Sequence, residues 1–141
     1  MPVFSTKFLT RISADIFSAA GMREDEARIV AKELVEANCA GHDSHGVIRV
    51  AQYLDQIAAG DIAPDAEVEV VRETPIIAVL DAHWGFGQVA MSRGVELGLA
   101  KAKASGMAAI AVHRANHVGR LGSYVEHIAR QNMVAQLFVN G

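Results

Sequence analysis

The spacing of hydrophobic residues changes partway along the chain, and this change constrains the fold more than any other feature. Up to residue 59, apolar side chains recur at the spacing of a helix, three or four residues apart. From residue 67 onward, they alternate with charged residues or form short continuous runs, as in strands. We therefore predict three helices, over residues 5–20, 23–40 and 47–59, followed by a region that contains a sheet.

The second region alternates strands with helices. We predict strands over residues 67–72, 75–80, 107–112 and 133–139, and helices over residues 88–105 and 121–131. The first strand has the alternation of a half-buried strand, whereas the later ones are nearly all apolar, as in a sheet covered on both faces. Gly94 and Gly98 share one face of the long helix and are expected to allow close approach of another backbone.

The predicted fold class is α/β, with an N-terminal three-helix region at residues 1–60 and part of a mixed sheet with covering helices at residues 61–141. We interpret the two regions as one incomplete domain, because Asn140 follows an apolar strand in the manner of a loop entry.

Composition narrows the possible functions. Hydrophobic residues make up 51% of the chain and the mean hydropathy is +0.20, which suggests surface hidden by another chain or by a missing part of this one. The net charge of −3 is spread over interspersed acids and bases, so nucleic acid is not an expected partner. Cys39 is the lone cysteine, which excludes a disulfide framework and favours a small buried apolar role. Without a signal-peptide pattern or an apolar run long enough for a bilayer, the cytoplasm is the expected location and no membrane contact is expected.

A polar cluster at residues 41–50 separates the second and third predicted helices and includes Ser44, His45 and Arg49. If a helix covers residues 47–59, His45 and Arg49 are four residues apart and could face one ligand. An imidazole moves protons near neutral pH, and a guanidinium grips a carboxylate with two hydrogen bonds. Taken alone, a simpler interpretation is favoured, in which Ser44 caps the helix, His45 is a solvated loop residue and Arg49 is a surface charge.

A second polar cluster at residues 116–122 follows an apolar strand and precedes a helix, where α/β sheets commonly bind ligands. His117 is its titratable group. Gly119 and Gly122 permit close approach, and backbone N–H groups at the helix start could bind an anion.

Residues 85–90 match the dinucleotide pattern G-x-G-x-x-A between a strand and a helix. The next strand ends without an acidic residue for a ribose, and Trp84 and Phe86 make the loop bulky. We interpret the segment as a tight strand-to-helix turn. No metal is predicted, because the histidines lack a recognised ligand spacing; His83, His113 and His127 are treated as surface or structural residues.

Several segments in order, at residues 41–49, 60–64, 85–88 and 115–119, resemble the malate/L-lactate dehydrogenase family. This family includes sulfolactate dehydrogenase, ureidoglycolate dehydrogenase, diketogulonate reductase and piperideine-carboxylate reductase. The resemblance implies a fold that is not a Rossmann fold. It also implies an oxidoreductase that transfers hydride between NAD or NADP and a small 2-oxo or 2-hydroxy acid, or that reduces a cyclic imine.

The resemblance also assigns roles to residues. Proton transfer would fall to His45, assisted by Ser44, or to His117, and Arg49 would bind the carboxylate of the small-molecule substrate. The cofactor site would be lined by the segment His117, Val118, Gly119, Arg120 and Leu121. Members of the family are generally homodimers, which fits the apolar surplus.

Members of this family are much longer than 141 residues, and most of their cofactor contacts come from the part that would follow residue 139. The chain is therefore expected to be a truncated, N-terminal portion. The competing hypothesis is a non-catalytic fragment that associates with a partner chain, and titration with NADH or NADPH would separate the two.

Overall fold

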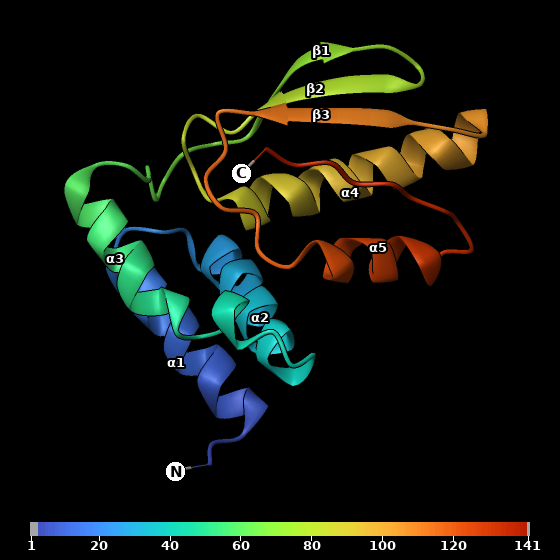
Figure 1. Cartoon of the computed structure of the whole chain (residues 1–141). Helices are drawn as coiled ribbons and strands as arrows, with labels where there is room; N and C mark the ends of the chain where they lie inside the picture. The colour runs from blue at the N-terminus through green and yellow to red at the C-terminus, as the bar shows by residue number, and fades with distance from the viewer. Residues whose placement is uncertain (1–2, 141) are drawn as a thin grey trace.

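The structure is a computed structural model that describes residues 3–140; the outermost residues of the two predicted regions lie outside it. Its elements follow the predicted order of three helices and then strands alternating with helices (Figure 1). They are α1 (Thr6–Ala19), α2 (Glu24–Cys39), the short 3₁₀ helix η1 (Asp43–His45), α3 (Arg49–Ala59), β1 (Glu69–Glu73), β2 (Ile77–Asp81), α4 (Gly87–Ser105), β3 (Ala109–His113) and α5 (Leu121–Ala129).

The helical region is packed on the sheet region through one shared core. Ser5 caps the start of α1: its hydroxyl accepts a hydrogen bond from the backbone N–H of Phe8 at 3.2 Å. Phe17 of α1 and Tyr53 of α3 each pack edge-on against Phe86, with ring centroids 5.6 and 5.5 Å from it. Because Phe86 immediately precedes α4, this aromatic cluster joins the two regions; the division at residue 60 stays a prediction.

The sheet is mixed, as predicted. β1 pairs antiparallel with β2, and β2 pairs parallel with β3, with Ile77 opposite Ala109 and Asp81 opposite His113. The connection from β2 to β3 is α4, which packs closely on the sheet. A Cβ on Gly98 would lie 3.1 Å from Cγ1 of Ile110 in β3. The two helix glycines therefore make room for the side chain of Ile110. The prediction that they allow close approach of another backbone is wrong.

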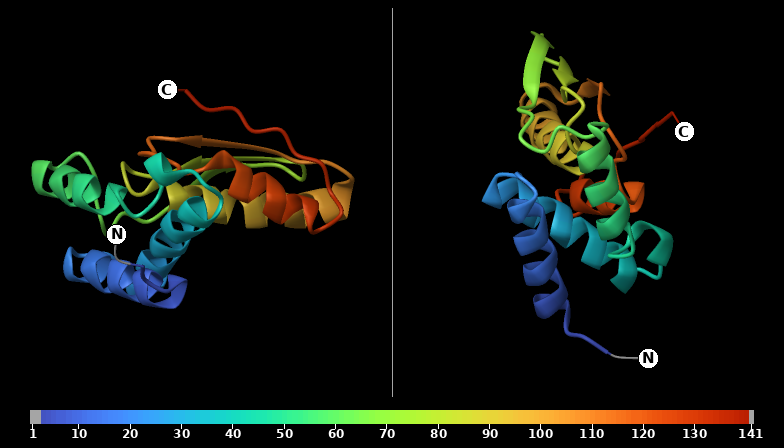
Figure 2. Two further views of the ribbon diagram at one scale, coloured as in Figure 1. Left: turned by 60° about the horizontal axis from the view of Figure 1, so that its bottom comes forward. Right: turned by 90° about the vertical axis from the view of Figure 1, so that its left-hand side faces the viewer.

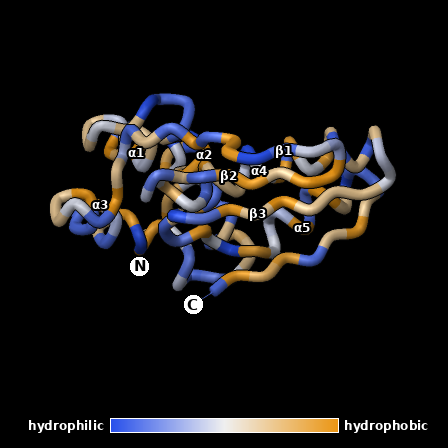
Figure 3. Tube along the Cα trace, turned by 90° about the horizontal axis from the view of Figure 1, so that it is seen from above, coloured by the Kyte–Doolittle hydropathy of each residue, from blue (hydrophilic) through white to orange (hydrophobic). Residues whose placement is uncertain are grey.

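The apolar strands predict a sheet covered on both faces, and in residues 3–140 helices cover one of these faces (Figure 1). α4 and α5 lie on one side of the strands, and the other side is open in the described part of the chain (Figure 1). Along β2, Ala78 and Leu80 are buried toward α4, whereas Ile77 is 42% exposed. β3 alternates exposed and partly buried residues, and β1 is exposed throughout rather than half-buried. Figure 3 looks onto this open face and shows hydrophobic residues along β2 and β3.

Residues 133–139 were predicted as a strand, and this prediction is wrong. The segment is extended and runs beside the free edge of β3 (Figures 2 and 3), but it forms no ladder with that strand. Met133 and Leu137 pack instead against the cluster of Val95, Leu99 and Tyr124. The apolar run that predicts a strand is thus an extended segment in which Met133, Ala135 and Leu137 are partly buried, and this packing does not require backbone pairing.

Two smaller predictions concern accessibility. Cys39, the last residue of α2, is exposed and not buried, because it lies beyond Ala37, the last buried residue of that helix. Within residues 3–140, none of the helices is both long and apolar enough to cross a membrane.

Candidate functional site

The parallel pairing of β2 and β3 brings the loops that follow them together. The backbone N–H of Ala82 donates to the carbonyl of His113 at 3.0 Å, and that of Asn116 donates to Gly85 at 3.2 Å. The side-chain amide of Asn116 donates to the carbonyl of Trp84 at 2.6 Å. These bonds hold His117, the next residue, against the start of α4.

Gly87 makes this contact possible. A Cβ at this position would lie 2.1 Å from the carbonyl oxygen of Asn116 and 2.6 Å from that of His117. The glycine is required by close packing, since its φ is not in the left-handed region. Residues 85–87 therefore form a strand-to-helix turn, as predicted. The backbone of residues 116–117 packs on this turn.

The first polar cluster is organised by Asn38, a residue of α2. Its amide nitrogen donates to Asp43 Oδ1 at 2.6 Å, and its amide oxygen accepts from the backbone N–H of Val47 at 2.8 Å. A Cβ on Gly46 would lie 2.2 Å from that amide oxygen, so the loop lies directly on it. Sequence reasoning missed this role, although a polar residue that continues the buried stripe of α2 was its signal.

The cluster does not extend α3. The helix begins at Arg49, two residues later than predicted, and His45 belongs to η1, so their four-residue spacing does not lie within one helix. Whether the two side chains face one ligand stays a prediction. Ser44 does not cap a helix through its side chain either; its hydroxyl lies 3.0 Å from Nδ1 of His45. Arg49 donates from Nε to the carbonyl of Ser44 at 2.6 Å and from Nη1 to Gln52 Oε1 at 2.8 Å. Arg49 thus closes the loop back onto the start of α3.

The two polar clusters meet at the rings of His45 and His117, whose centroids are 5.2 Å apart. Burial lowers the pKa of His117, and the nearby charges of Arg49 and His45 lower it further. The structure therefore brings together the predicted residues Ser44, His45, Arg49 and His117, which come from two distant parts of the chain.

Two further residues of this site were missed. Tyr53 Oη lies 2.7 Å from Nδ1 of His117, and Gln88 Nε2 donates to Tyr53 Oη at 2.8 Å. Burial raises the pKa of Tyr53. Tyr53 fits the helical pattern of α3, and Gln88 lies inside the glycine-rich segment, so neither carried a separate signal in the sequence.

The predicted cofactor segment, residues 117–121, leads into α5. The carbonyl of Val118 accepts from Tyr124 Oη at 2.5 Å, and Gly119 has a φ of 79°. Arg120 donates from both Nη1 and Nη2 to Glu126 at 3.0 Å. Leu121 packs with Tyr124 in the cluster beside α4. Arg120 and Leu121 are thus engaged within the chain.

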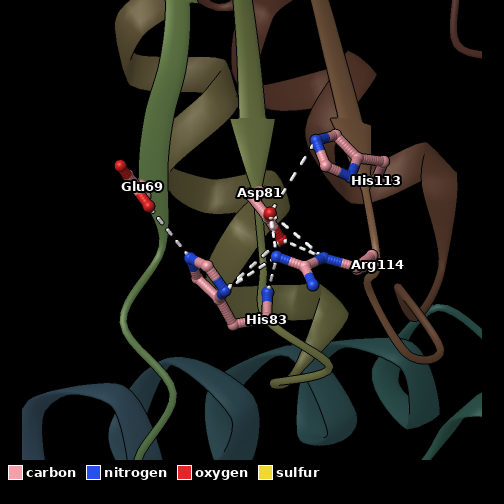
Figure 4. Close-up of polar contacts among 5 residues, drawn as sticks. All are labelled: Glu69, Asp81, His83, His113 and Arg114. Carbon is pink, nitrogen blue, oxygen red and sulfur yellow. Dashed lines mark hydrogen bonds and ion pairs between the residues drawn. The ribbon is translucent and has the colours of Figure 1, made fainter.

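A third polar cluster lies at the carboxyl ends of β2 and β3, centred on Asp81 (Figure 4). Arg114 Nε donates to the two carboxylate oxygens at 2.9 and 3.0 Å, and its Nη2 also contacts the carboxylate. These bonds hold the pKa of Asp81 well below its usual range. His83 links the pair to Glu69 at 3.1 Å, and His113 borders it. His83 and His113 are therefore structural in this cluster, beside the loop that carries His117.

Comparison with known proteins places this arrangement in a family. The family model described as malate/L-lactate dehydrogenase matches residues 4–141. The hydroxycarboxylate dehydrogenase B of Escherichia coli (strain K12) is 35% identical over 137 residues, which cover 97% of this chain and 38% of that protein. The (2R)-3-sulfolactate dehydrogenase (NADP(+)) of Chromohalobacter salexigens is 36% identical over 122 residues, covering 86% of this chain and 36% of that protein.

Solved structures agree with the sequence relatives. The sulfolactate dehydrogenase of Methanocaldococcus jannaschii superposes with a TM-score of 0.91 at 33% identity, covering 94% of this chain and 38% of that one. The Δ1-piperideine-2-carboxylate reductase of Pseudomonas syringae gives a TM-score of 0.86 at 28% identity, covering 93% and 40%. The chain thus spans well under half the length of the relatives it matches. The matches of its sequence and of its fold together establish that the chain belongs to the malate/L-lactate dehydrogenase family.

Proposed function

We propose that the chain forms the N-terminal part of an oxidoreductase that transfers hydride between NAD or NADP and a small 2-oxo or 2-hydroxy acid, or a cyclic imino acid. The observation that carries this proposal is the meeting of His45 and His117, 5.2 Å apart, beside the guanidinium of Arg49. A proton-transfer group next to a carboxylate-binding group is what reduction of a 2-oxo acid requires. The relatives are named for hydroxycarboxylate, sulfolactate and piperideine-carboxylate substrates, and one of them for NADP(+).

Arg49 binds the substrate carboxylate in this proposal. Its Nε and one hydrogen of Nη1 are used by Ser44 and Gln52. The end of the guanidinium, formed by Nη1 and Nη2, retains hydrogens in a planar fork that matches a carboxylate. Because the internal bonds fix the orientation of the fork, the substrate would meet a preset guanidinium.

His117 transfers the proton, and His45, with Ser44 against its Nδ1, orients the substrate or assists the transfer. Hydride goes to the substrate carbon and the proton goes to its oxygen, so the proton donor must reach that oxygen. His117 is favoured because it lies in the segment, residues 117–121, that would line the nicotinamide cofactor. We further propose that the enzyme acts as a homodimer in the cytoplasm.

The substitution Arg49→Lys tests the carboxylate role in the protein that carries this chain. A lysine keeps the charge but lacks the fork, so the loss of one charge-assisted contact should cost about 1.5–3 kcal/mol, seen as a higher KM for the 2-oxo acid. Arg11→Lys on the surface of α1 is the matched control and should leave KM unchanged. If the Arg49→Lys variant keeps the wild-type kcat/KM, Arg49 does not bind the substrate carboxylate.

The alternative, a non-catalytic fragment that associates with a partner chain, makes a different prediction. Titration with NADH and with NADPH should quench the fluorescence of Trp84 saturably, or raise the melting temperature, if the oxidoreductase proposal holds. Trp84 suits this measurement because it is the lone tryptophan, is exposed, and accepts a hydrogen bond from Asn116 next to His117. No response to either cofactor would favour the fragment.

A further inference from the structure

A buried chain of hydrogen bonds approaches His117 from the interior of the molecule. Tyr53 is 1% exposed, and Gln88, at the start of α4, is 0% exposed. Tyr53 Oη lies between them, 2.8 Å from Gln88 Nε2 and 2.7 Å from His117 Nδ1. The three groups therefore form one line, from α4 through α3 to the loop that follows β3.

The direction of these bonds is fixed by what each group can donate. The amide nitrogen of Gln88 has hydrogens and no lone pair to share, so the oxygen of Tyr53 accepts from it. The hydroxyl of Tyr53 has a single hydrogen, and among its contacts in residues 3–140 the acceptor that remains is Nδ1 of His117. Nδ1 then carries no hydrogen of its own.

The opposite orientation of the Gln88 amide fits less well. Its Oε1 is buried without a partner in the described part of the chain. Turning the amide by 180° would place the NH2 group, with both of its hydrogens, where Oε1 has no partner. Buried N–H groups without partners are rarer than buried oxygens without partners. The orientation in which Nε2 faces Tyr53 therefore leaves fewer donors unsatisfied.

We propose that Gln88 and Tyr53 are positioning residues that hold His117 as the neutral tautomer with its hydrogen on Nε2. Nδ1 faces Tyr53, so Nε2 is the nitrogen left for a ligand, and its N–H donates a hydrogen bond to the substrate oxygen. When that proton passes to the oxygen, Nδ1 takes the hydrogen of the Tyr53 hydroxyl, so His117 stays neutral and the oxygen of Tyr53 keeps the hydrogen bond from Gln88. After the product leaves, solvent returns a proton to Nε2 and Nδ1 returns its hydrogen to Tyr53. This catalytic meaning depends on the proposed function, whereas the tautomer itself does not.

Two other features act in the same direction. Protonation of Nδ1 would set its hydrogen against that of Tyr53, so the hydroxyl would have to turn away. The ring of Tyr53 cannot move aside easily, because Phe86 packs edge-on against it at 5.5 Å and Phe17 lies 6.2 Å away. Burial and the charges of Arg49 and His45 also lower the pKa of His117.

Nitrogen NMR of ¹⁵N-histidine in the protein that carries this chain tests the proposal without an activity measurement. The resonances of His117 are identified by their loss in His117→Gln. At neutral pH, Nε2 should show the shift of a protonated nitrogen and Nδ1 that of an unprotonated acceptor. A wild-type His117 with its hydrogen on Nδ1, or doubly protonated at neutral pH, would overturn the assignment.

Substitution of Gln88 gives a sharper test because it predicts a reversal. In Gln88→Glu, a carboxylate accepts the hydrogen of Tyr53, so Tyr53 must accept from His117 and the hydrogen moves to Nδ1. If this variant does not fold, Tyr53→Phe serves the same purpose: it keeps the ring packing and should give a mixture of both tautomers. Tyr124→Phe, which removes another buried hydroxyl, is the control and should keep the wild-type tautomer. Unchanged tautomers in Gln88→Glu and in Tyr53→Phe would contradict the proposal.

Kinetics then separate this inference from the proposed function. Tyr53→Phe should lower kcat by about 10- to 100-fold and shift the pH profile, a smaller loss than the roughly 10²–10⁴-fold expected without the proton-transfer group itself. The Nε2–H tautomer in a protein without 2-oxo-acid reductase activity would refute the proposed function alone. Full activity with the Nδ1–H tautomer would refute the inference alone.

Discussion

The two sides of the His117 ring lie in different environments. Tyr53, which accepts a hydrogen bond from Gln88, contacts it from the core, while His45 and Arg49 lie on the other side. The interior side determines where the hydrogens are, and the outer side supplies charge and a second imidazole. A single half-buried histidine can therefore keep a defined protonation state and still reach a ligand.

The two histidines should differ in kinetic role. We expect His117→Gln to lower kcat by roughly 10²–10⁴-fold and to remove one limb of the pH–rate profile. Since its pKa is lowered, that limb should lie below the ordinary histidine value of about 6.5. His45→Gln should mainly raise KM, because it removes an orienting group. Steady-state rates of both variants across pH give the answer, and the reverse pattern would exchange the two roles.

The start of α4 is the element that connects the loops, because the backbone of residues 116–117 lies directly on Gly87. Gly87→Ala should be strongly destabilising, since its Cβ would meet a carbonyl oxygen at 2.1 Å and backbone cannot yield cheaply. Gly98→Ala on the same helix is the matched control. Its Cβ would meet a side-chain carbon of Ile110 at 3.1 Å, and alanine offers about 1 kcal/mol of helix propensity as compensation. Thermal melts should show a large loss for the first and a small change for the second; equal effects would contradict the packing argument.

The ends of β2 and β3 are joined by the ion pair of Asp81 and Arg114. This pair should make the stability of the fold depend on pH in the acidic range. The pKa of Asp81 lies below its ordinary value near 4. As pH falls, the unfolded chain therefore takes up the proton first, and the stability that the pair contributes at neutral pH declines from about pH 5 downward.

Asp81→Asn removes that contribution. The variant should melt below wild type at pH 7, and the gap should narrow toward pH 3, because the wild type is then losing the same interaction. Asp55→Asn, at an exposed position on α3, is the control and should show a small, constant difference. A gap for Asp81→Asn that stays constant from pH 7 to pH 3 would show that the pair does not titrate as proposed.

For the whole molecule, the sequence predicts the order of elements well because local spacing determines helices and strands. Contacts between distant residues follow no local pattern, and these are where prediction failed. The unpaired segment at residues 133–139 and the exposure of Cys39 both depend on what lies beside an element in space. At the site, Ser44, His45, Arg49 and His117 are polar residues outside the helical stripes, so they could be predicted. Tyr53 and Gln88 act from within helices and could not, whereas Asn38 had a signal, as a polar residue on the buried stripe of α2.

The hydrogen bond between Tyr53 and His117 joins residues that are 64 positions apart in the sequence, and this separation affects the order in which the chain folds. Contacts so far apart must close a large loop, so they form after the local turns of α3 and α4. During refolding, the helical signal should therefore appear before the tautomer of His117 becomes fixed. A partly folded chain would already contain its helices and still lack the oriented histidine, so chemical competence would be the last property to appear.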